Sequence, residues 1–353
     1  MKRWVVRAGR IFPDGLIAED VPRPEPGPGE VRIKIIAASI NARDLMMVNG
    51  SFGEPQRDFI PLSDGSGEID AIGSGVEGFA LGDRVSGLYY SDWIDGPPIP
   101  DRGWGLGSLG DDGMLAEWAV LKARRVAAIP TTLKFEEAAC LPCAALTAWT
   151  ALNGDRPYRS PVSKEDKVLI TGTGNVALFA LLFAKAAGAY VVVTTSTAGK
   201  ATRARRLGAS NTVNYRNDAA WGESASALAG PFDRVVNAAG SGALDQSITA
   251  LAPGGEITLI GFLDAAGSVP NFLELMIKGG AIRGTSVGGA LAFADMAAFI
   301  DYYRIRAPIA KIFPMSEAKA AYQLAGSAQR FGKVVIAVNA SQHSLRRQRF
   351  PSR

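Results

Sequence analysis

A glycine-rich turn lies between two apolar segments in the middle of the chain. Gly172, Gly174 and Ala177 have the spacing G-x-G-x-x-A and follow the apolar run 168–170. In this pattern the first glycine permits a tight turn, the second lets the backbone approach a pyrophosphate, and the third small residue lets a helix pack on the strand. Free N–H groups at the start of that helix attract phosphate. The turn predicts a dinucleotide site; the alternative is a strand–helix turn that binds nothing.

The residues that end the next apolar run indicate which dinucleotide would bind. An acidic residue about 20 positions beyond the glycines holds the ribose 2′-hydroxyl of NAD. This chain instead has TTST at 194–197, followed by Lys200, Arg203, Arg205 and Arg206. Hydroxyls and cations suit a 2′-phosphate. The sequence therefore predicts NADP(H) as the cofactor.

Few residues of the chain are suited to metal binding or acid–base chemistry. The single histidine, His343, lies near the end of the chain. Cys140 and Cys143 form a C-x-x-C motif, which elsewhere binds zinc or carries out redox chemistry. They lie in an apolar run, AACLPCAALTAW, which is typical of buried thiols that act as small hydrophobic side chains. We expect neither a metal site nor a redox pair here.

Composition indicates a globular enzyme-sized protein. A chain of 353 residues with 47% hydrophobic residues predicts two domains with a large core. Two cysteines and an N-terminus without a secretory pattern favour the cytoplasm, and no apolar run is long enough to predict a membrane partner. The net charge of +4 comes from four arginines in 341–353, so we expect a solvated basic tail and no nucleic-acid partner.

The order of predicted elements changes near residue 167. Before it, short strands alternate with glycine and proline turns, which predicts a mostly β domain. After it, strands alternate with helices, which predicts an α/β domain with a doubly wound, six-stranded parallel sheet. The expected strands are 168–170, 190–194, 212–214, 234–237, 257–260 and 281–284. Helices are expected at 175–187, 295–304 and 316–326, and a final strand, 333–338, is expected to return to the first domain.

Seven motifs, taken in order, resemble the medium-chain dehydrogenase/reductase superfamily. They are SINARD (39–44), PLSDGSGE (61–68), LGDRV (81–85), DGMLAEW (112–118), LPCAALTAW (141–149), GTG (172–174) and FGKVV (331–335). The resemblance covers residues 1–339 and favours the zinc-independent, quinone-oxidoreductase-like or zinc-free alcohol dehydrogenase-like branch. It implies a GroES-like catalytic domain at 1–131 and 299–340, a Rossmann domain at 132–298, a tail at 341–353, an active site between the domains, and a homodimer built through the Rossmann sheets.

The resemblance also implies that no metal is bound. The position of the first zinc-binding cysteine of the family is Asn41, and the family's His–Glu pair falls on Ser63 and Asp64. The four-cysteine structural zinc lobe is missing from the sequence as well. Zinc needs three protein N, S or O ligands, and Cys143 with Asp64 is a poor set.

Hydride transfer from NADPH to an activated C=C bond of an enone, or to a quinone, is the predicted reaction. Hydrogen bonds can stabilise the negative charge that develops on the carbonyl oxygen, whereas alcohol oxidation without zinc must deprotonate a hydroxyl near neutral pH. The substrate would be a small apolar carbonyl compound or quinone. Two alternatives remain: a zinc-free NADP-dependent alcohol dehydrogenase or carbonyl reductase, and an NADPH-binding protein without redox turnover.

Catalytic candidates come from two segments. In the family the Asn41 position lies near the nicotinamide ribose, where its amide can orient cofactor or substrate; the alternative is an asparagine that closes a turn. Asp44 is a second candidate, or only a helix cap. Ala42 replaces a tyrosine that is a candidate proton donor in the family, and the aromatic candidates to replace that donor are Tyr89, Tyr90 and Trp93, whose alternative role is packing.

Cofactor contacts carry over from the motifs. Ser196 and Lys200 match the family's 2′-phosphate pair, and Tyr215 resembles a tyrosine beside that phosphate. Asn175 replaces a second glycine of the family's turn. The full set of expected cofactor-binding residues is Asn41, Thr147, Gly172, Thr173, Gly174, Asn175, Val176, Thr195, Ser196, Lys200, Tyr215, Asn237, Ala238, Gly261, Phe262, Leu263 and Lys333, the last of which is alternatively a solvated lysine at a strand end.

Overall fold

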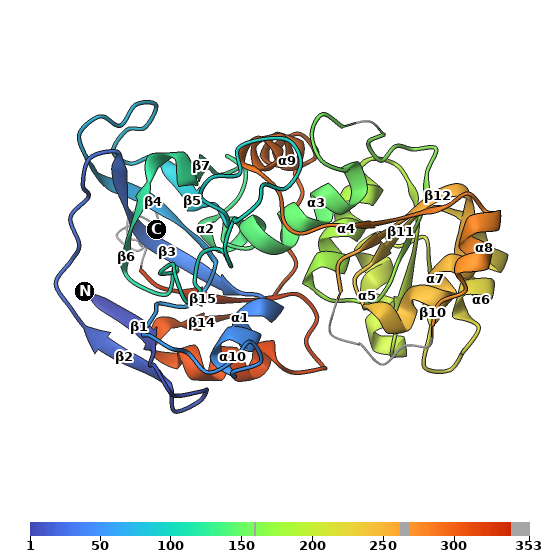
Figure 1. Cartoon of the computed structure of the whole chain (residues 1–353), viewed down its shortest axis with the longest axis horizontal. Helices are drawn as coiled ribbons and strands as arrows, with labels where there is room; N and C mark the ends of the chain where they lie inside the picture. The colour runs from blue at the N-terminus through green and yellow to red at the C-terminus, as the bar shows by residue number, and fades with distance from the viewer. Residues whose placement is uncertain (159, 262–268, 340–353) are drawn as a thin grey trace, which may run out of the picture. The chain divides into compact units, whose positions relative to one another are not determined.

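The computed structural model describes residues 1–158, 160–261 and 269–339. The chain divides into two compact units (Figure 1). The outer unit comprises residues 1–143 and the described residues from 289 onward, and the inserted unit comprises residues 144–288. Each unit is described by itself.

A parallel sheet forms the centre of the inserted unit. Among the described residues it has six strands in the order β10-β9-β8-β11-β12-β13, and every recorded pairing between them is parallel. The strands are β8 (Lys167–Ile170), β9 (Tyr190–Thr195), β10 (Asn211–Asn214), β11 (Phe232–Asn237), β12 (Leu251–Leu259) and β13 (Ala281–Gly284). This is the doubly wound Rossmann sheet expected from the sequence. The predicted strands are found within one or two residues of their expected ends, except that β12 begins at Leu251, six residues before the expected 257.

Helix α3 (Leu146–Asn153) precedes β8, and the other helices lie between the strands. They are α4 (Asn175–Ala186), α5 (Ala198–Arg206), α6 (Trp221–Ala229), α7 (Leu244–Ala250) and α8 (Phe272–Ile277), with a short 3₁₀ helix at Ser241–Ala243. A short π-helix, Leu141–Ala145, comes just before α3. Helix α4 has apolar residues on most of its sides, and most of its residues are buried, as its sequence predicted. The β-branched and leucine side chains of the central strands form the core with no exposed surface, including Leu169, Val192, Val235 and Ile257.

The outer unit is mostly β, as predicted. Its described residues contain a seven-stranded sheet in the order β14-β15-β3-β4-β5-β7, with β6 also pairing with β3, and a two-stranded sheet, β1-β2. The strands are β1 (Lys2–Val6), β2 (Leu16–Asp20), β3 (Glu30–Ile40), β4 (Asp64–Ile72), β5 (Arg84–Gly87), β6 (Trp118–Lys122), β7 (Val126–Ala128), β14 (Ile309–Pro314) and β15 (Lys333–Ala337). The helices are α1 (Ala42–Val48), α2 (Phe135–Ala138), α9 (Ala290–Tyr303) and α10 (Ala318–Ala325), with short turns at Ala123–Arg125 and Met315–Glu317.

The last strand returns to the first part of the chain, as expected. Strand β15 pairs with β3 in antiparallel register, with Val334 opposite Ile40. On the other side of β3, Ser39 lies opposite Asp64 at the start of β4. The end of β3 and the starts of β4 and β15 therefore meet at one place in the sheet, and this junction positions the polar site described below.

Within the described residues, no helix is both long and apolar enough to span a membrane.

Candidate functional site

Four side chains form a closed ring of hydrogen bonds at the junction of β3, β4 and β15. The Lys333 ammonium donates to Asn41 Oδ1 at 2.5 Å and to Asp64 Oδ2 at 3.3 Å. Asn41 Nδ2 donates to Ser63 Oγ at 3.2 Å, and Ser63 Oγ donates to Asp64 Oδ1 at 2.9 Å. We call Asn41, Ser63, Asp64 and Lys333 the Lys333 ring. Each side chain of the ring is hydrogen-bonded to two others, so the four side chains hold one another in place.

Burial distinguishes this ring from a surface ion pair. Ser63, Asp64 and Lys333 have no exposed surface, and Asn41 is 4% exposed. The interpretation of Lys333 as a solvated lysine at a strand end is therefore wrong. The reason is the strand register: β15 lies inside the sheet, and its first residue faces a carboxylate that compensates the buried charge.

Asp44 and Arg43 support the ring from the next turn of chain. Asp44 Oδ2 accepts from the Asn41 backbone N–H at 2.8 Å, so Asp44 holds the start of α1. Arg43 Nη1 donates to Asp44 Oδ1 at 3.1 Å and to the Leu106 carbonyl at 2.9 Å. Burial raises the pKa of Asp44, and the Arg43 guanidinium opposes that rise. These contacts favour the capping interpretation of Asp44 over a role in proton transfer.

The three aromatic candidates are packed together in the outer unit. Tyr89, Tyr90 and Trp93 are all buried, with ring centroids 4.6 Å apart for the first pair and 5.9 Å apart for the second. The Arg43 guanidinium lies 5.3 Å from the Tyr89 ring, and that of Arg102 lies 5.0 Å from the Tyr90 ring. Burial raises the pKa of Tyr89. The arrangement favours packing over proton donation for these side chains.

The environment of both cysteines disfavours the thiolate form. No disulfide joins them, and Cys140 Sγ donates to the Glu136 carbonyl at 3.3 Å. Burial raises the pKa of Cys140 to about 12 and also raises that of Cys143. The thiolate is the reactive and metal-binding form, so protonated cysteines are inert. In the part of the chain that the structure describes, no group of three His, Cys, Asp or Glu residues is arranged to hold a metal ion.

The glycine turn of the inserted unit is shaped for a phosphate. Gly172 has φ +81°, and its N–H donates to Thr194 Oγ1 at 2.9 Å. Helix α4 begins at Asn175 with Gly174 as its N-cap, and no described side chain caps it. A Cβ on Gly172 or Gly174 would meet no described atom within 4 Å. There is therefore open space beside this helix start, where Thr173, Asn175 and Val176 also lie.

Residues expected near a 2′-phosphate gather at the ends of β9 and β10. Thr197 caps α5 by accepting from the Lys200 backbone N–H at 3.2 Å, which places Lys200 on the first turn of the helix and Ser196 just before its N-cap. The Tyr215 N–H donates to the Thr195 carbonyl at 3.1 Å, so the two strand ends lie together. The buried Thr195 hydroxyl has no hydrogen-bond partner among the described residues.

The ends of β11 and β12 are also held by side chains. Asn237 Oδ1 accepts from the Gly240 N–H at 3.0 Å, and Thr171 Oγ1 accepts from the Ala238 N–H at 3.0 Å. The Gly261 N–H donates to the Asn237 carbonyl at 3.2 Å, so the two strand ends are adjacent. Thr147 is buried in α3, and Phe262 and Leu263 lie outside the described residues.

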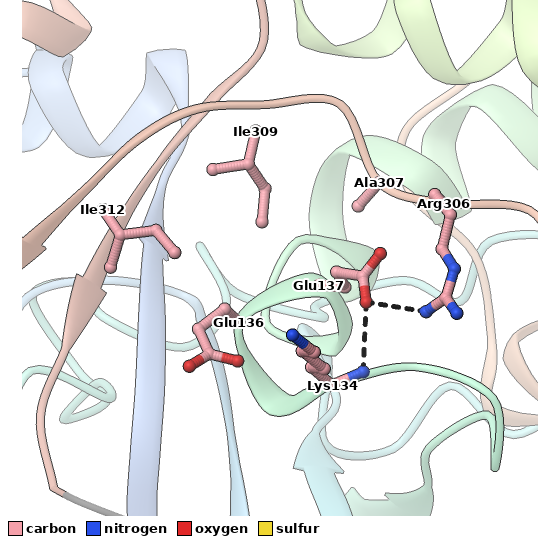
Figure 2. Close-up of a pocket in the computed structure, with 7 residues that line it drawn as sticks. All are labelled: Lys134, Glu136, Glu137, Arg306, Ala307, Ile309 and Ile312. Atoms are coloured by element: carbon pink, nitrogen blue, oxygen red, sulfur yellow. Dashed lines mark hydrogen bonds and ion pairs between the residues drawn. The ribbon is translucent and has the colours of Figure 1, made fainter. Parts of the chain in front are cut away.

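A separate pocket of about 460 Å³ lies in the outer unit (Figure 2). Its lining residues are Lys134, Glu136, Glu137, Arg306, Ala307, Ile309 and Ile312. Glu137 Oε2 accepts from Arg306 Nη1 at 2.9 Å and from the Lys134 N–H at 3.1 Å, as the dashed lines in Figure 2 show. Through these two bonds Glu137 fixes the start of α2. None of the predicted site residues lines the pocket. We assign it no role in the site.

Comparison with known proteins gives the class of the chain. A family model described as alcohol dehydrogenase GroES-like domain matches residues 27–131, and one described as zinc-binding dehydrogenase matches residues 175–302. A zinc-type alcohol dehydrogenase-like protein of Schizosaccharomyces pombe is 38% identical over 319 residues, covering 88% of this chain and 92% of its own. The chain therefore belongs to the medium-chain dehydrogenase/reductase superfamily, with the GroES-like and Rossmann parts that the resemblance implied.

Other relatives differ in their named activity. The crystal structure of an NAD-dependent alcohol dehydrogenase has a TM-score of 0.83 and 31% identity, and the match covers 96% of this chain and all of that one. An acryloyl-coenzyme A reductase of Metallosphaera sedula is 28% identical over 348 residues, covering 95% of this chain and 99% of its own. Within the superfamily the chain is alcohol dehydrogenase-like, and these homologues are oxidoreductases.

The family implies two bound groups, a dinucleotide and a zinc ion, and the residues of this chain suit only the first. The glycine turn and the orphaned Thr195 hydroxyl fit a dinucleotide. A zinc ion does not fit the residues at the Lys333 ring, where an amide, a hydroxyl and one carboxylate are joined to an ammonium group. The motifs had marked Ser63 and Asp64 only as lost metal ligands, and the sequence carries no local signal of their contact with Lys333.

Proposed function

We propose that this protein is an NADPH-dependent, zinc-independent reductase that transfers hydride to an activated C=C bond of an enone or enoyl compound, or to a quinone. The main observation that supports this proposal is the Lys333 ring, which offers hydrogen-bond donors and a positive charge but no set of metal ligands. The cofactor would supply the hydride. Donors of this kind stabilise negative charge on a carbonyl oxygen, which is what reduction of an activated double bond requires.

The choice of NADPH depends on the end of β9. The run that follows the strand has hydroxyls at 194–197 and a lysine at 200, with no acidic residue in this stretch. A carboxylate would repel the 2′-phosphate, whereas a hydroxyl and an ammonium attract it. One structural relative is named NAD-dependent, so the fold alone does not favour NADPH, and the proposed preference rests on these residues.

The activity is tested by following NADPH absorbance with a panel of enones, enoyl thioesters and quinones, in which each enone is matched to the corresponding saturated ketone. We expect oxidation of NADPH with the unsaturated compounds. Turnover of the ketones only would support the second candidate, a zinc-free carbonyl reductase or alcohol dehydrogenase. Two relatives carry names of the alcohol dehydrogenase type, one of them zinc-type and the other NAD-dependent. Tight NADPH binding with no turnover across the panel would contradict both and leave a nucleotide-binding protein.

Replacing Lys200 by alanine is expected to raise the dissociation constant of NADPH by about 10- to 100-fold, because a charge-assisted contact contributes about 1.5–3 kcal/mol. NADH binding should change by less than about twofold. Lys164→Ala, which removes an exposed lysine of the same unit, is the matched control. Both constants are measured by fluorescence titration, and an equal loss for the two nucleotides would remove Lys200 from the 2′-phosphate site.

We also propose a homodimer through the inserted unit. On α8, Phe272, Leu273, Met276 and Ile277 are 53–75% exposed. Strand β13 lies at the edge of the sheet, with β12 as its neighbour in the described residues. An exposed apolar face beside an unpaired strand edge is suited to pairing with a second copy.

The expected result for Met276→Glu is a shift from dimer to monomer, because a charge would have to be buried in the interface. Light scattering coupled to gel filtration measures the mass. Leu228→Glu, at an exposed apolar position on α6, should remain dimeric and serves as the control. A monomeric wild-type chain would contradict the proposal.

A further inference from the structure

The Lys333 ring stands at the positions that the family uses to bind a metal. Asn41 replaces the first cysteine ligand, and Ser63 and Asp64 replace the His–Glu pair. The fourth member, Lys333, comes from a strand 269 residues further along the chain than Asp64. It brings a positive charge into a buried place.

We propose that the Lys333 ammonium is the cation of this site and takes the place of the metal ion. The inference rests on the proposed function and adds the residue that carries the charge. A metal ion and a buried ammonium cannot both be compensated by the one carboxylate of the ring, since Asp64 already pairs with Lys333 at 3.3 Å.

The ring gives Lys333 a defined way to act. Because Lys333 holds Oδ1 of Asn41, the orientation of the amide is fixed. One Nδ2 hydrogen of Asn41 is bonded to Ser63 Oγ, and an amide nitrogen carries two. The second hydrogen is the donor for a substrate carbonyl oxygen. Lys333 is thus a positioning residue that acts through Asn41, and its positive charge lies close to the substrate oxygen that Asn41 would bind.

The chemistry balances without a further reactant. The cofactor would supply a hydride to the β-carbon of the substrate, and the electron pair of the C=C bond would move to the carbonyl oxygen as an enolate. Asn41 donates to that oxygen, and the Lys333 charge lowers its energy in a low-dielectric site. A proton from water then bonds to the α-carbon. The substrate gains one hydride and one proton in total, which is the two-electron reduction of one C=C bond.

The first test compares Lys333→Met, Lys333→Arg and the control Arg32→Met. Arg32 is a buried cation of the same unit, paired with Asp70 at 2.8 Å on the distant half of β3. We expect Lys333→Met to lower kcat about 100-fold, with the KM for NADPH unchanged within about threefold. Lys333→Arg should recover part of kcat, and Arg32→Met should keep it. An unchanged kcat, or a rise only in the KM for NADPH, would overturn the proposal and make Lys333 a cofactor contact.

The second test does not depend on activity and therefore separates this inference from the proposed function. After dialysis against zinc chloride, metal analysis of the wild-type chain should find far less than one zinc per chain. The variant Asn41→Cys/Ser63→His restores two zinc ligands and should still exclude zinc, whereas adding Lys333→Met should allow about one zinc per chain. One zinc bound while Lys333 is present, in either protein, would overturn the proposal even if the reductase activity were established. Failure of the activity panel with the expected zinc result would overturn only the proposed reaction.

Discussion

Replacing Asp64 by alanine is expected to lower the free energy of unfolding of the outer unit by about 3–5 kcal/mol, because it leaves a buried ammonium without its carboxylate. Asp64 and Lys333 have no exposed surface, so water cannot compensate the loss. Ser63 Oγ also loses its acceptor. Urea unfolding of the full chain, followed by intrinsic fluorescence, measures the change.

A double variant tests whether the charge is the cause. Lys333→Met/Asp64→Leu removes both charges and should recover a large part of the lost stability, because a buried ion pair can often be exchanged for apolar side chains. If Asp64→Ala unfolded within about 0.5 kcal/mol of the wild type, Lys333 could not be held as the structure shows.

Replacing Gly174 by valine is expected to weaken NADPH binding by at least about 100-fold with little change in stability. Gly174 caps α4 with φ −73° and ψ 177°, an extended conformation that valine can adopt. The added Cβ would meet no described atom within 4 Å, so the protein has room for it. The same space is where the pyrophosphate must approach the backbone.

The control for this variant is Gly326→Val, at an exposed glycine after α10 whose added Cβ would lie 3.7 Å from its nearest atoms. Its affinity for NADPH should equal that of the wild type. Titration calorimetry gives the affinities and thermal unfolding gives the stabilities. Unchanged NADPH binding by Gly174→Val would show that the dinucleotide does not lie over this turn.

The inserted sheet could be predicted from the sequence because its signals are local. Apolar runs such as 168–170 and 190–194 end in glycine or polar residues, and strands buried on both faces need such runs. Helix α4 followed from its glycine turn, although its N-cap is Gly174 and Asn175 is its first residue. The returning strand β15 was also expected, since the motif at 331–335 continues as an apolar run.

The polar site could not be predicted in the same way. The sequence shows a lysine at the start of a strand and an aspartate at the start of another, and both patterns are typical of solvated ends. Only the register of β15 against β3 and of β3 against β4 brings Lys333 to Asn41 and Asp64. Such contacts depend on tertiary pairing over hundreds of residues, which local propensity does not encode.

The division of the chain affects the order in which it can fold during synthesis. The inserted unit is one continuous stretch, residues 144–288, so it is complete on the ribosome while β14 and β15 are still to be made. Strand β15 belongs inside the outer sheet, between β14 and β3, so that sheet keeps an open edge until the last strand arrives. A product truncated before residue 333 would therefore combine a finished inserted unit with an unpaired strand and a carboxylate that lacks its ammonium. Such a product would be a target for proteolysis rather than a weaker enzyme.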